Sequence, residues 1–103
     1  FVEGFRADYL ITSMGAIEAD GSLLDFDVNE TTVVKAMMAH SRHILLAADH
    51  TKFHASAAVE IGNVGKATAL FTDDEPPAAL SALLQQQQVE LVVTSSAQQK
   101  PTL

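Results

Sequence analysis

The run Ile44-Leu45-Leu46-Ala47-Ala48, followed at once by Asp49-His50-Thr51-Lys52-Phe53, decides the fold. Its first five residues are continuously apolar instead of alternating, which is typical of a strand covered on both faces in a parallel sheet. The polar residues that follow end the strand and stand at its carboxyl end. Ligands of open α/β sheets bind beyond the carboxyl ends of the strands. This stretch therefore predicts a buried parallel strand and, directly after it, a candidate binding loop.

Other strands are expected on both sides of this run. Short apolar segments bounded by polar or turn-forming residues predict them. These segments are 9–12, 57–61, 67–72 and 89–93. The acidic stretch 18–27, with its Asp20-Gly21 turn signal, is expected to be a loop.

Two helices are expected between the strands. Apolar residues at helical spacing predict the first over 31–40, directly after Asn29. The second begins at Pro76-Pro77 and ends within the glutamine run 85–88. The order strand, helix, strand, strand, helix, strand predicts an α/β fold with a mainly parallel sheet and flanking helices.

Composition limits the classes of function. A chain of 103 residues forms one domain, and its 48% hydrophobic content is enough for a folded core. The net charge of −7 argues that this chain does not itself grip DNA, because phosphate binding needs clustered Lys and Arg. No apolar run is long enough to cross a bilayer, so no membrane association is expected. The absence of cysteine fits a reducing cytoplasmic location.

Three short segments follow predicted strands and should meet at one edge of the sheet. They are 13–15, 49–52 and 72–74. In the second of them, Lys52 could hold a phosphate as a point charge while Asp49 accepts a hydrogen bond from a ligand hydroxyl. The alternative is that Asp49 only caps a helical turn and Lys52 is solvated.

Other polar clusters are less informative. His50 and His54 are four residues apart, but two imidazoles are too few for a closed metal shell, so no metal site is predicted. Asp25, Asp27 and Glu30 could perform acid–base chemistry or bind a polyol, and an acidic loop that keeps the surface soluble explains them equally well. Because no nucleophile or phosphate-loop motif is present, no catalytic residue is assigned.

Four stretches together resemble the DeoR family of bacterial transcriptional repressors. They are Gly15–Asp27, Lys35–Met37, Ser41–Leu46 and Ala48–Phe53. In that family an N-terminal winged helix-turn-helix binds the operator and a C-terminal sensor domain binds a phosphorylated metabolite. The sensor resembles the α/β fold of ribose-5-phosphate isomerase and CoA-transferase.

The resemblance implies that residues 1–94 are the later part of such a sensor domain and that 95–103 form a polar tail. The winged helix-turn-helix is then absent from this chain, so the full-length protein would bind operator DNA through that missing domain. The implied function is effector sensing for a repressor of glycerol and glycerol 3-phosphate metabolism. Glycerol 3-phosphate is the expected effector. A cytoplasmic homo-oligomer without enzymatic activity or cofactor is expected.

The resemblance also implies effector-binding positions. Lys52 matches the lysine of the family's S-S-K-F pattern, and Asp49 is its preceding acid. Lys35 matches a lysine in the helix after the acidic loop. Glu30 and Asp27 lie in that acidic stretch, where Glu30 falls near the catalytic glutamate of the isomerase relatives.

Gly15 is the remaining implied position, and it departs from the family pattern. Many members carry an acid where this chain has Gly15. The missing carboxylate would fit a smaller ligand without a sugar ring. Two alternatives stay open: an isomerase-like enzyme with Glu30 as base and Lys52 as phosphate anchor, which Gly15 disfavours, and an oligomerisation module with a vestigial pocket.

Overall fold

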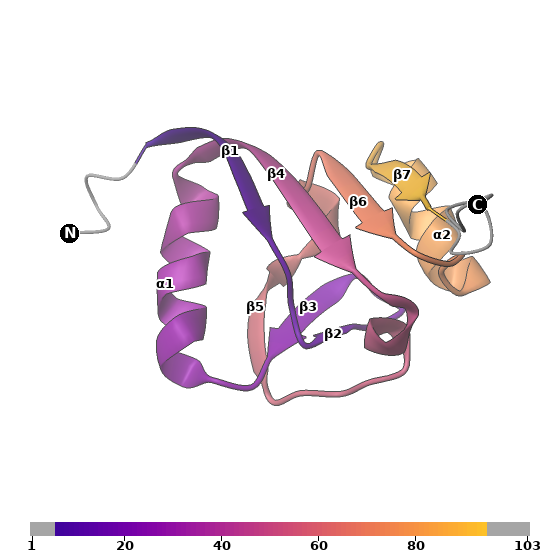
Figure 1. Ribbon diagram of the computed structural model, residues 1–103, viewed down its shortest axis with the longest axis horizontal. Helices are drawn as coiled ribbons and strands as arrows, with labels where there is room; N and C mark the ends of the chain where they lie inside the picture. The colour runs from indigo at the N-terminus through magenta and orange to yellow at the C-terminus, as the bar shows by residue number, and fades with distance from the viewer. Residues whose placement is uncertain (1–5, 95–103) are drawn as a thin grey trace, which may run out of the picture.

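The computed structural model describes residues 6–94, and the predicted polar tail at 95–103 lies outside them. Its main sheet has four parallel strands in the spatial order β1, β4, β6, β7 (Figure 1). The strands are β1 (Ala7–Thr12), β4 (Ser41–Ala48), β6 (Ala69–Thr72) and β7 (Glu90–Val93). The predicted α/β class with a mainly parallel sheet is confirmed.

A second, antiparallel sheet corrects two of the strand predictions. It consists of β2 (Ala16–Ile17), β3 (Ser22–Asp25) and β5 (Val59–Asn63), with β3 in the middle. The stretch 18–27 is therefore not all loop, because β3 lies within it. The strand expected near 57–61 exists as β5, but it pairs with β3 and not with the parallel strands.

The signal for β3 is weak because only two apolar residues, Leu23 and Leu24, lie between acidic neighbours. Both are buried. Gly21 makes the preceding turn at a φ of +90°, which only glycine adopts without strain. A side chain there would also meet Leu83 at 2.7 Å and Val64 at 2.9 Å. The Asp20-Gly21 turn is therefore the tight connection between β2 and β3, which pair with each other.

Helix α1 (Val28–Ala39) connects β1 and the small sheet to β4. Its N-cap is Asp27, whose side chain accepts hydrogen bonds from the backbone N–H groups of Asn29 at 2.8 Å and Glu30 at 3.2 Å. The helix thus begins three residues before the predicted start at residue 31.

Helix α2 (Ala78–Gln86) follows Pro76 and Pro77, as predicted. Leu80 and Leu84 are buried on its inner side. Gln88, at a φ of +61°, turns the chain out of the helix and into β7. No helix within residues 6–94 is long and apolar enough to span a membrane.

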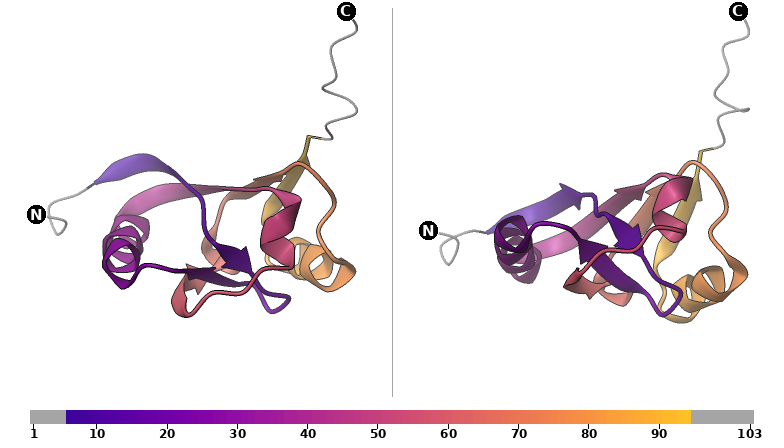
Figure 2. Two further views of the ribbon diagram at one scale, coloured as in Figure 1. Left: turned by 60° about the horizontal axis from the view of Figure 1, so that its bottom comes forward. Right: turned by 90° about the horizontal axis from the view of Figure 1, so that it is seen from below.

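The core lies on one side of the parallel sheet. Both helices and the small sheet lie on that side, as the two rotated views show (Figure 2). The inward strand residues and the helices meet in one cluster of buried side chains. Its fully buried large members are Ile17, Leu23, Leu46, Leu70, Leu80, Leu84 and Val64. This packing fixes the strands so that their carboxyl ends form one edge.

Candidate functional site: a cavity at the strand ends

Each of the four parallel strands is followed directly by a polar residue at this edge. The residues are Ser13 after β1, Asp49 after β4, Asp73 after β6 and Thr94 after β7. All four line one cavity of about 510 Å³, which we call the strand-end cavity. Lys52 also lines it, and the apolar part of its wall comes from Ala47, Ala48, Phe71 and Thr72. The predicted meeting of the three loop segments is therefore observed.

Asp49 is fixed by the short 3₁₀ turn His50–Phe53, of which it is the N-cap. Its Oδ1 accepts a hydrogen bond of 2.9 Å from the backbone N–H of Thr51 and a second from the Thr51 hydroxyl. These two donors, with the hydroxyl contributing most, hold the pKa of Asp49 below its ordinary value. Asp49 is thus an ionised acceptor, and the capping role weighed for it in the sequence is confirmed.

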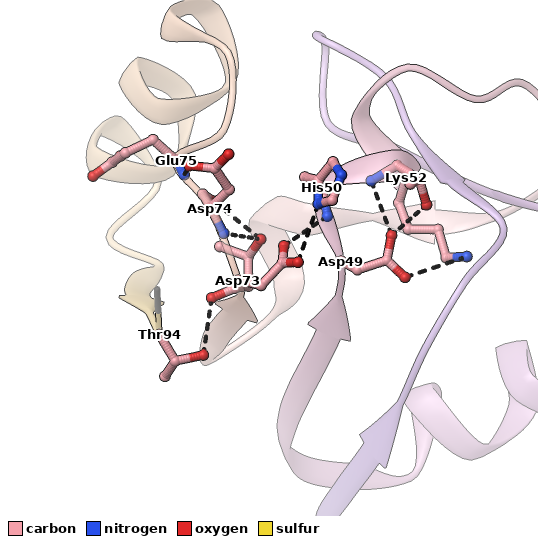
Figure 3. Close-up of polar contacts among 9 residues, drawn as sticks. Asp49, His50, Lys52, Asp73, Asp74, Glu75 and Thr94 are labelled. Carbon is pink, nitrogen blue, oxygen red and sulfur yellow. Dashed lines mark hydrogen bonds and ion pairs between the residues drawn. The ribbon is translucent and has the colours of Figure 1, made fainter. Parts of the chain in front are cut away.

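The same 3₁₀ turn places Lys52, three residues after Asp49, close to the Asp49 carboxylate. Its Nζ lies 3.9 Å from Asp49 Oδ2, and 31% of its side chain is exposed (Figure 3). That separation is longer than the roughly 2.7–2.9 Å of a charge-assisted hydrogen bond. The pair therefore orients the ammonium without saturating its three N–H donors. Lys52 is also one of the residues that line the strand-end cavity.

His50 and Asp73 join two of the strand ends. Asp73 Oδ1 accepts a 2.7 Å hydrogen bond from the backbone N–H of His50, and its Oδ2 lies 3.1 Å from His50 Nδ1. The contact with Asp73, a hydrogen bond reinforced by charge, raises the pKa of His50 above its ordinary value. Figure 3 shows Asp73 lying between His50 and Thr94. Both carboxylates of the cavity thus have partners within the chain: Asp49 contacts Thr51, and Asp73 contacts His50.

A second cavity of about 530 Å³ lies beside the start of α1, and we call it the helix-side cavity. Glu30 lines it together with Asp25 and Asn29, and Val33 and Val34 form its apolar wall. Ser13 lines both cavities, with Thr12 next to it in the second. The structure therefore places Asp49 and Lys52 together and Glu30 in an adjoining space.

The other three predicted positions lie elsewhere. Asp27 is the N-cap of α1, and Lys35 is exposed on that helix; neither lines one of the two cavities. Gly15 is buried below the ring of Phe26: a Cβ on Gly15 would lie 2.6 Å from Phe26 Cε2. An acid at position 15 would need the space that Phe26 occupies. Roles for these residues in effector binding stay predictions.

The histidine pair considered as metal ligands is not grouped with further ligands. His50 contacts Asp73, and His54 ends the 3₁₀ turn through its backbone N–H. Within the described part of the chain, no three His, Cys, Asp or Glu side chains are close enough to hold a metal ion together.

Sequence reasoning missed one cavity residue and one contact between strand ends. Thr94 belongs to none of the three predicted loop segments, although its N–H donates to the Thr72 carbonyl at 2.8 Å and so extends the pairing of β6 with β7. The link between His50 and Asp73 spans 23 residues, and no local spacing indicates it. The available signal was that Thr94 and Asp73 each stand directly after a predicted strand.

Comparison with known proteins gives one family. Residues 1–74 match the family described as the DeoR C terminal sensor domain. The chain is 74% identical over 74 residues to the HTH-type transcriptional repressor CsqR of Escherichia coli (strain K12), which covers 72% of this chain and 28% of that protein.

Glycerol-3-phosphate regulon repressors are also similar. The one from Escherichia coli (strain K12) is 40% identical over 73 residues, covering 71% of this chain and 29% of that protein. The one from Haemophilus influenzae is 46% identical over 74 residues, covering 72% and 29%. This chain thus spans less than a third of the length of these relatives.

Proposed function

This chain belongs to the family of DeoR C-terminal sensor domains, and from this we propose that it is the effector-sensing part of a transcriptional repressor. The effector is a small phosphorylated metabolite that binds in the strand-end cavity. Glycerol 3-phosphate is the candidate, since repressors of a glycerol-3-phosphate regulon are among the similar proteins. The full-length protein acts in the cytoplasm as a homo-oligomer and binds operator DNA through a domain outside this chain.

The observation that carries this proposal is the position of Lys52. Lys52 lines the cavity at the strand ends, and its ammonium is held 3.9 Å from Asp49 Oδ2. An ammonium with free donors binds a phosphate as a point charge. The Asp49 carboxylate is already compensated by Thr51, so it does not neutralise Lys52 fully.

The acidic residues suit the glycerol part of the ligand. Ionised carboxylates only accept hydrogen bonds, and each glycerol hydroxyl is a donor. Asp49 accepts from a glycerol hydroxyl in the strand-end cavity, and Glu30, which lines the adjoining helix-side cavity, stays a predicted contributor. The ligand then needs one anionic end and several hydroxyls. Roles for Asp27, Lys35 and Gly15 stay predictions, because none of these residues lines either cavity.

Effector binding works by shifting a population. The effector binds more tightly to the arrangement of the full-length oligomer in which the DNA-reading domains no longer fit the operator. Differential affinity for the two arrangements supplies the coupling free energy, typically about 1–3 kcal/mol. A ligand with equal affinity for both arrangements would not release the protein from its operator.

The test is release of the full-length protein from its operator by glycerol 3-phosphate, followed by an electrophoretic mobility shift. Lys52→Ala should bind the operator normally without effector but require about 10- to 100-fold more effector for release, because a hydrogen bond to a charged group contributes roughly 1.5–3 kcal/mol. Lys66→Ala is the matched control, since Lys66 is exposed and lines neither cavity.

The outcomes separate the two parts of the proposal. If glycerol 3-phosphate releases Lys52→Ala at the wild-type concentration, the strand-end cavity is not the effector site. If it does not release the wild-type protein while another phosphorylated metabolite does, the cavity stands and the choice of effector is wrong.

The isomerase alternative is less well supported by the geometry. It needs Glu30 as base and Lys52 as phosphate anchor on one small substrate. These two residues line different cavities that share only Ser13. Turnover of a sugar phosphate by the full-length protein would be needed to favour it.

A further inference from the structure

His50 contacts a wall of the strand-end cavity without lining the cavity itself. Both oxygens of the Asp73 carboxylate face it: Oδ1 accepts a 2.7 Å hydrogen bond from the His50 backbone N–H, and Oδ2 lies 3.1 Å from His50 Nδ1 (Figure 3). Asp73 is among the residues that line the cavity, and His50 is not. His50 can therefore influence a ligand there through its carboxylate partner without touching the ligand.

The Asp73 side of this pair stands on a fixed support. The hydroxyl of the buried Thr72 donates to the Asp74 carbonyl at 3.1 Å and accepts from the Asp74 N–H at 3.4 Å, so it closes the turn that contains Asp73. The Thr72 carbonyl in turn accepts a 2.8 Å hydrogen bond from the Thr94 N–H. The residues that carry Asp73 are thus tied to the end of β7.

The His50 side of the pair belongs to the 3₁₀ turn that carries Lys52. The turn is closed by local hydrogen bonds, from the Lys52 N–H to the Asp49 carbonyl at 3.0 Å and from the His54 N–H to the Thr51 carbonyl at 3.3 Å. These bonds set the shape of the turn, but not its place relative to the next strand. The contacts of His50 with the end of β6 contribute to that placement, and so to the position of Lys52.

The charges that line the cavity do not balance for an anionic ligand. Its lining residues include two carboxylates, Asp49 and Asp73, and one ammonium, Lys52. A phosphate monoester adds a charge of about −1.5 to −2 near neutral pH. Protonated His50 would supply a second cation, in contact with Asp73. Its side chain is 59% exposed, so it exchanges protons with the solvent.

The acidic groups that face His50 favour its protonated form. Asp73 contributes most, through the hydrogen bond and then through its charge, and the charges of Asp49 and Asp74 add to it, so the pKa of His50 is raised. Lys52, on the same turn, has its ammonium 3.9 Å from the Asp49 carboxylate. Strand β2, which packs against the turn, has no titratable residue. His50 therefore changes its charge near neutral pH.

We propose that His50 is a positioning residue for effector binding, and that its protonation strengthens the binding of a phosphorylated effector in the strand-end cavity. The inference rests on the proposed function and adds a dependence of that site on pH. The imidazolium compensates Asp73, so the phosphate meets less negative charge. As the pH rises through the raised pKa of His50, the imidazole becomes neutral. Its Nδ1–H still donates to Asp73, but the affinity for the anion falls.

The coupling acts in both directions. An anion that binds more tightly beside the imidazolium also favours the imidazolium, because linked binding equilibria are reciprocal. A bound phosphorylated effector therefore raises the pKa of His50 further. We expect a change in affinity of about fivefold, at the low end of the usual range of coupling between sites, since His50 is well exposed.

The test compares Kd values for glycerol 3-phosphate in the native full-length protein, by calorimetric titration at about pH 6 and about pH 8.5. His50→Asn keeps the backbone N–H and a neutral side-chain donor but cannot be protonated. Its Kd should match that of the wild type at the higher pH and be about fivefold larger at the lower pH. The second ionisation of the phosphate, near pH 6, is common to all proteins compared and cancels in the ratio of their Kd values.

His54→Asn is the matched control. His54 is exposed, ends the same turn and lines neither cavity. Its Kd should follow that of the wild type at both pH values. A ratio between His50→Asn and wild type that is the same at both pH values would overturn the inference and leave the proposed function standing. Failure of the wild type to bind either glycerol 3-phosphate or inorganic phosphate would overturn the proposed function, and this inference with it.

NMR titration of the wild type gives a second reading that needs no variant. Saturation with glycerol 3-phosphate should raise the pKa of His50, and an unchanged pKa would contradict the inference. If another metabolite is the effector, inorganic phosphate replaces glycerol 3-phosphate in both measurements, because it is the anion that phosphorylated effectors share. The expected directions are then the same.

Discussion

Asp73 holds His50 through two contacts, a 2.7 Å hydrogen bond from the His50 backbone N–H and a 3.1 Å contact with its Nδ1. The two residues follow β6 and β4, which are neighbours in the parallel sheet. The pair thus ties together the two strand ends between which the cavity opens. The segment that carries Asp49 and Lys52 is thereby held against the end of β6.

The first prediction concerns the titration of His50. Its pKa should exceed the ordinary value of 6.5 and should fall towards that value in Asp73→Asn, because the raising comes mainly from the Asp73 contact. The contribution of the pair to the free energy of unfolding is fully present below pH 6.5. It is lost as the pH rises through the raised folded pKa.

NMR titration of the imidazole signals measures this directly. The His50 signals are compared between the wild type and Asp73→Asn. A His50 pKa that is the same in wild type and Asp73→Asn would show that the two side chains do not interact in solution.

The second prediction concerns Asp49 and its cap. The pKa of Asp49 should lie below 3.8 and should rise in Thr51→Val, which removes the hydroxyl that contributes most to the lowering. The stabilisation is present above the ordinary pKa and is lost as the pH falls through the lowered folded value. Side-chain carboxyl ¹³C shifts measure the titration of Asp49 in the two proteins. An unchanged Asp49 titration in Thr51→Val would contradict the capping geometry.

How much of this site the sequence predicted depends on the range of each interaction. The cap at Asp49 and the ion pair with Lys52 span two and three residues, so local spacing was enough to single out both residues. The apolar run 44–48 likewise predicted β4, because a strand of a parallel sheet is typically a continuous run of apolar residues. The link between His50 and Asp73 depends on which strands become neighbours, and no short-range pattern specifies this.

The antiparallel sheet was missed for a similar reason. β2 has only two residues, and β3 is hidden in an acidic stretch. β3 pairs with β2 on one side and with β5, more than 30 residues away, on the other, and Leu23 of β3 is buried in the core. Tertiary packing thus overrides the weak local preference of the 18–27 segment.

The third prediction tests the position where this chain departs from its family pattern. Gly15→Asp restores an acid but places its Cβ against the Phe26 ring, at 2.6 Å if nothing moves. Phe26 is 67% exposed, so its ring can move aside, and the cost should lie at or below the lower end of the roughly 1–3 kcal/mol that overpacking of a core causes. The double variant Gly15→Asp/Phe26→Ala should recover most of that loss, because the truncated side chain leaves the space empty.

Chemical denaturation of the four members of this cycle gives the coupling free energy between the two positions. Gly65→Ala is a control, since its Cβ would meet only the Gln87 and Asn63 side chains, at 3.1 and 3.2 Å. Additive effects of Gly15→Asp and Phe26→Ala would show that Phe26 does not exclude an acid from position 15.

The fourth prediction is the most direct test of the strand-end cavity as a phosphate-binding site. Isothermal titration calorimetry of the full-length protein with glycerol 3-phosphate should give a single binding event that inorganic phosphate competes for and that glycerol does not reproduce. In Lys52→Ala the Kd should rise about 10- to 100-fold, while Lys66→Ala keeps the wild-type value. Equal Kd values for wild type and Lys52→Ala would contradict the account, because the ammonium at the cavity wall would then contribute nothing to recognition of the anion.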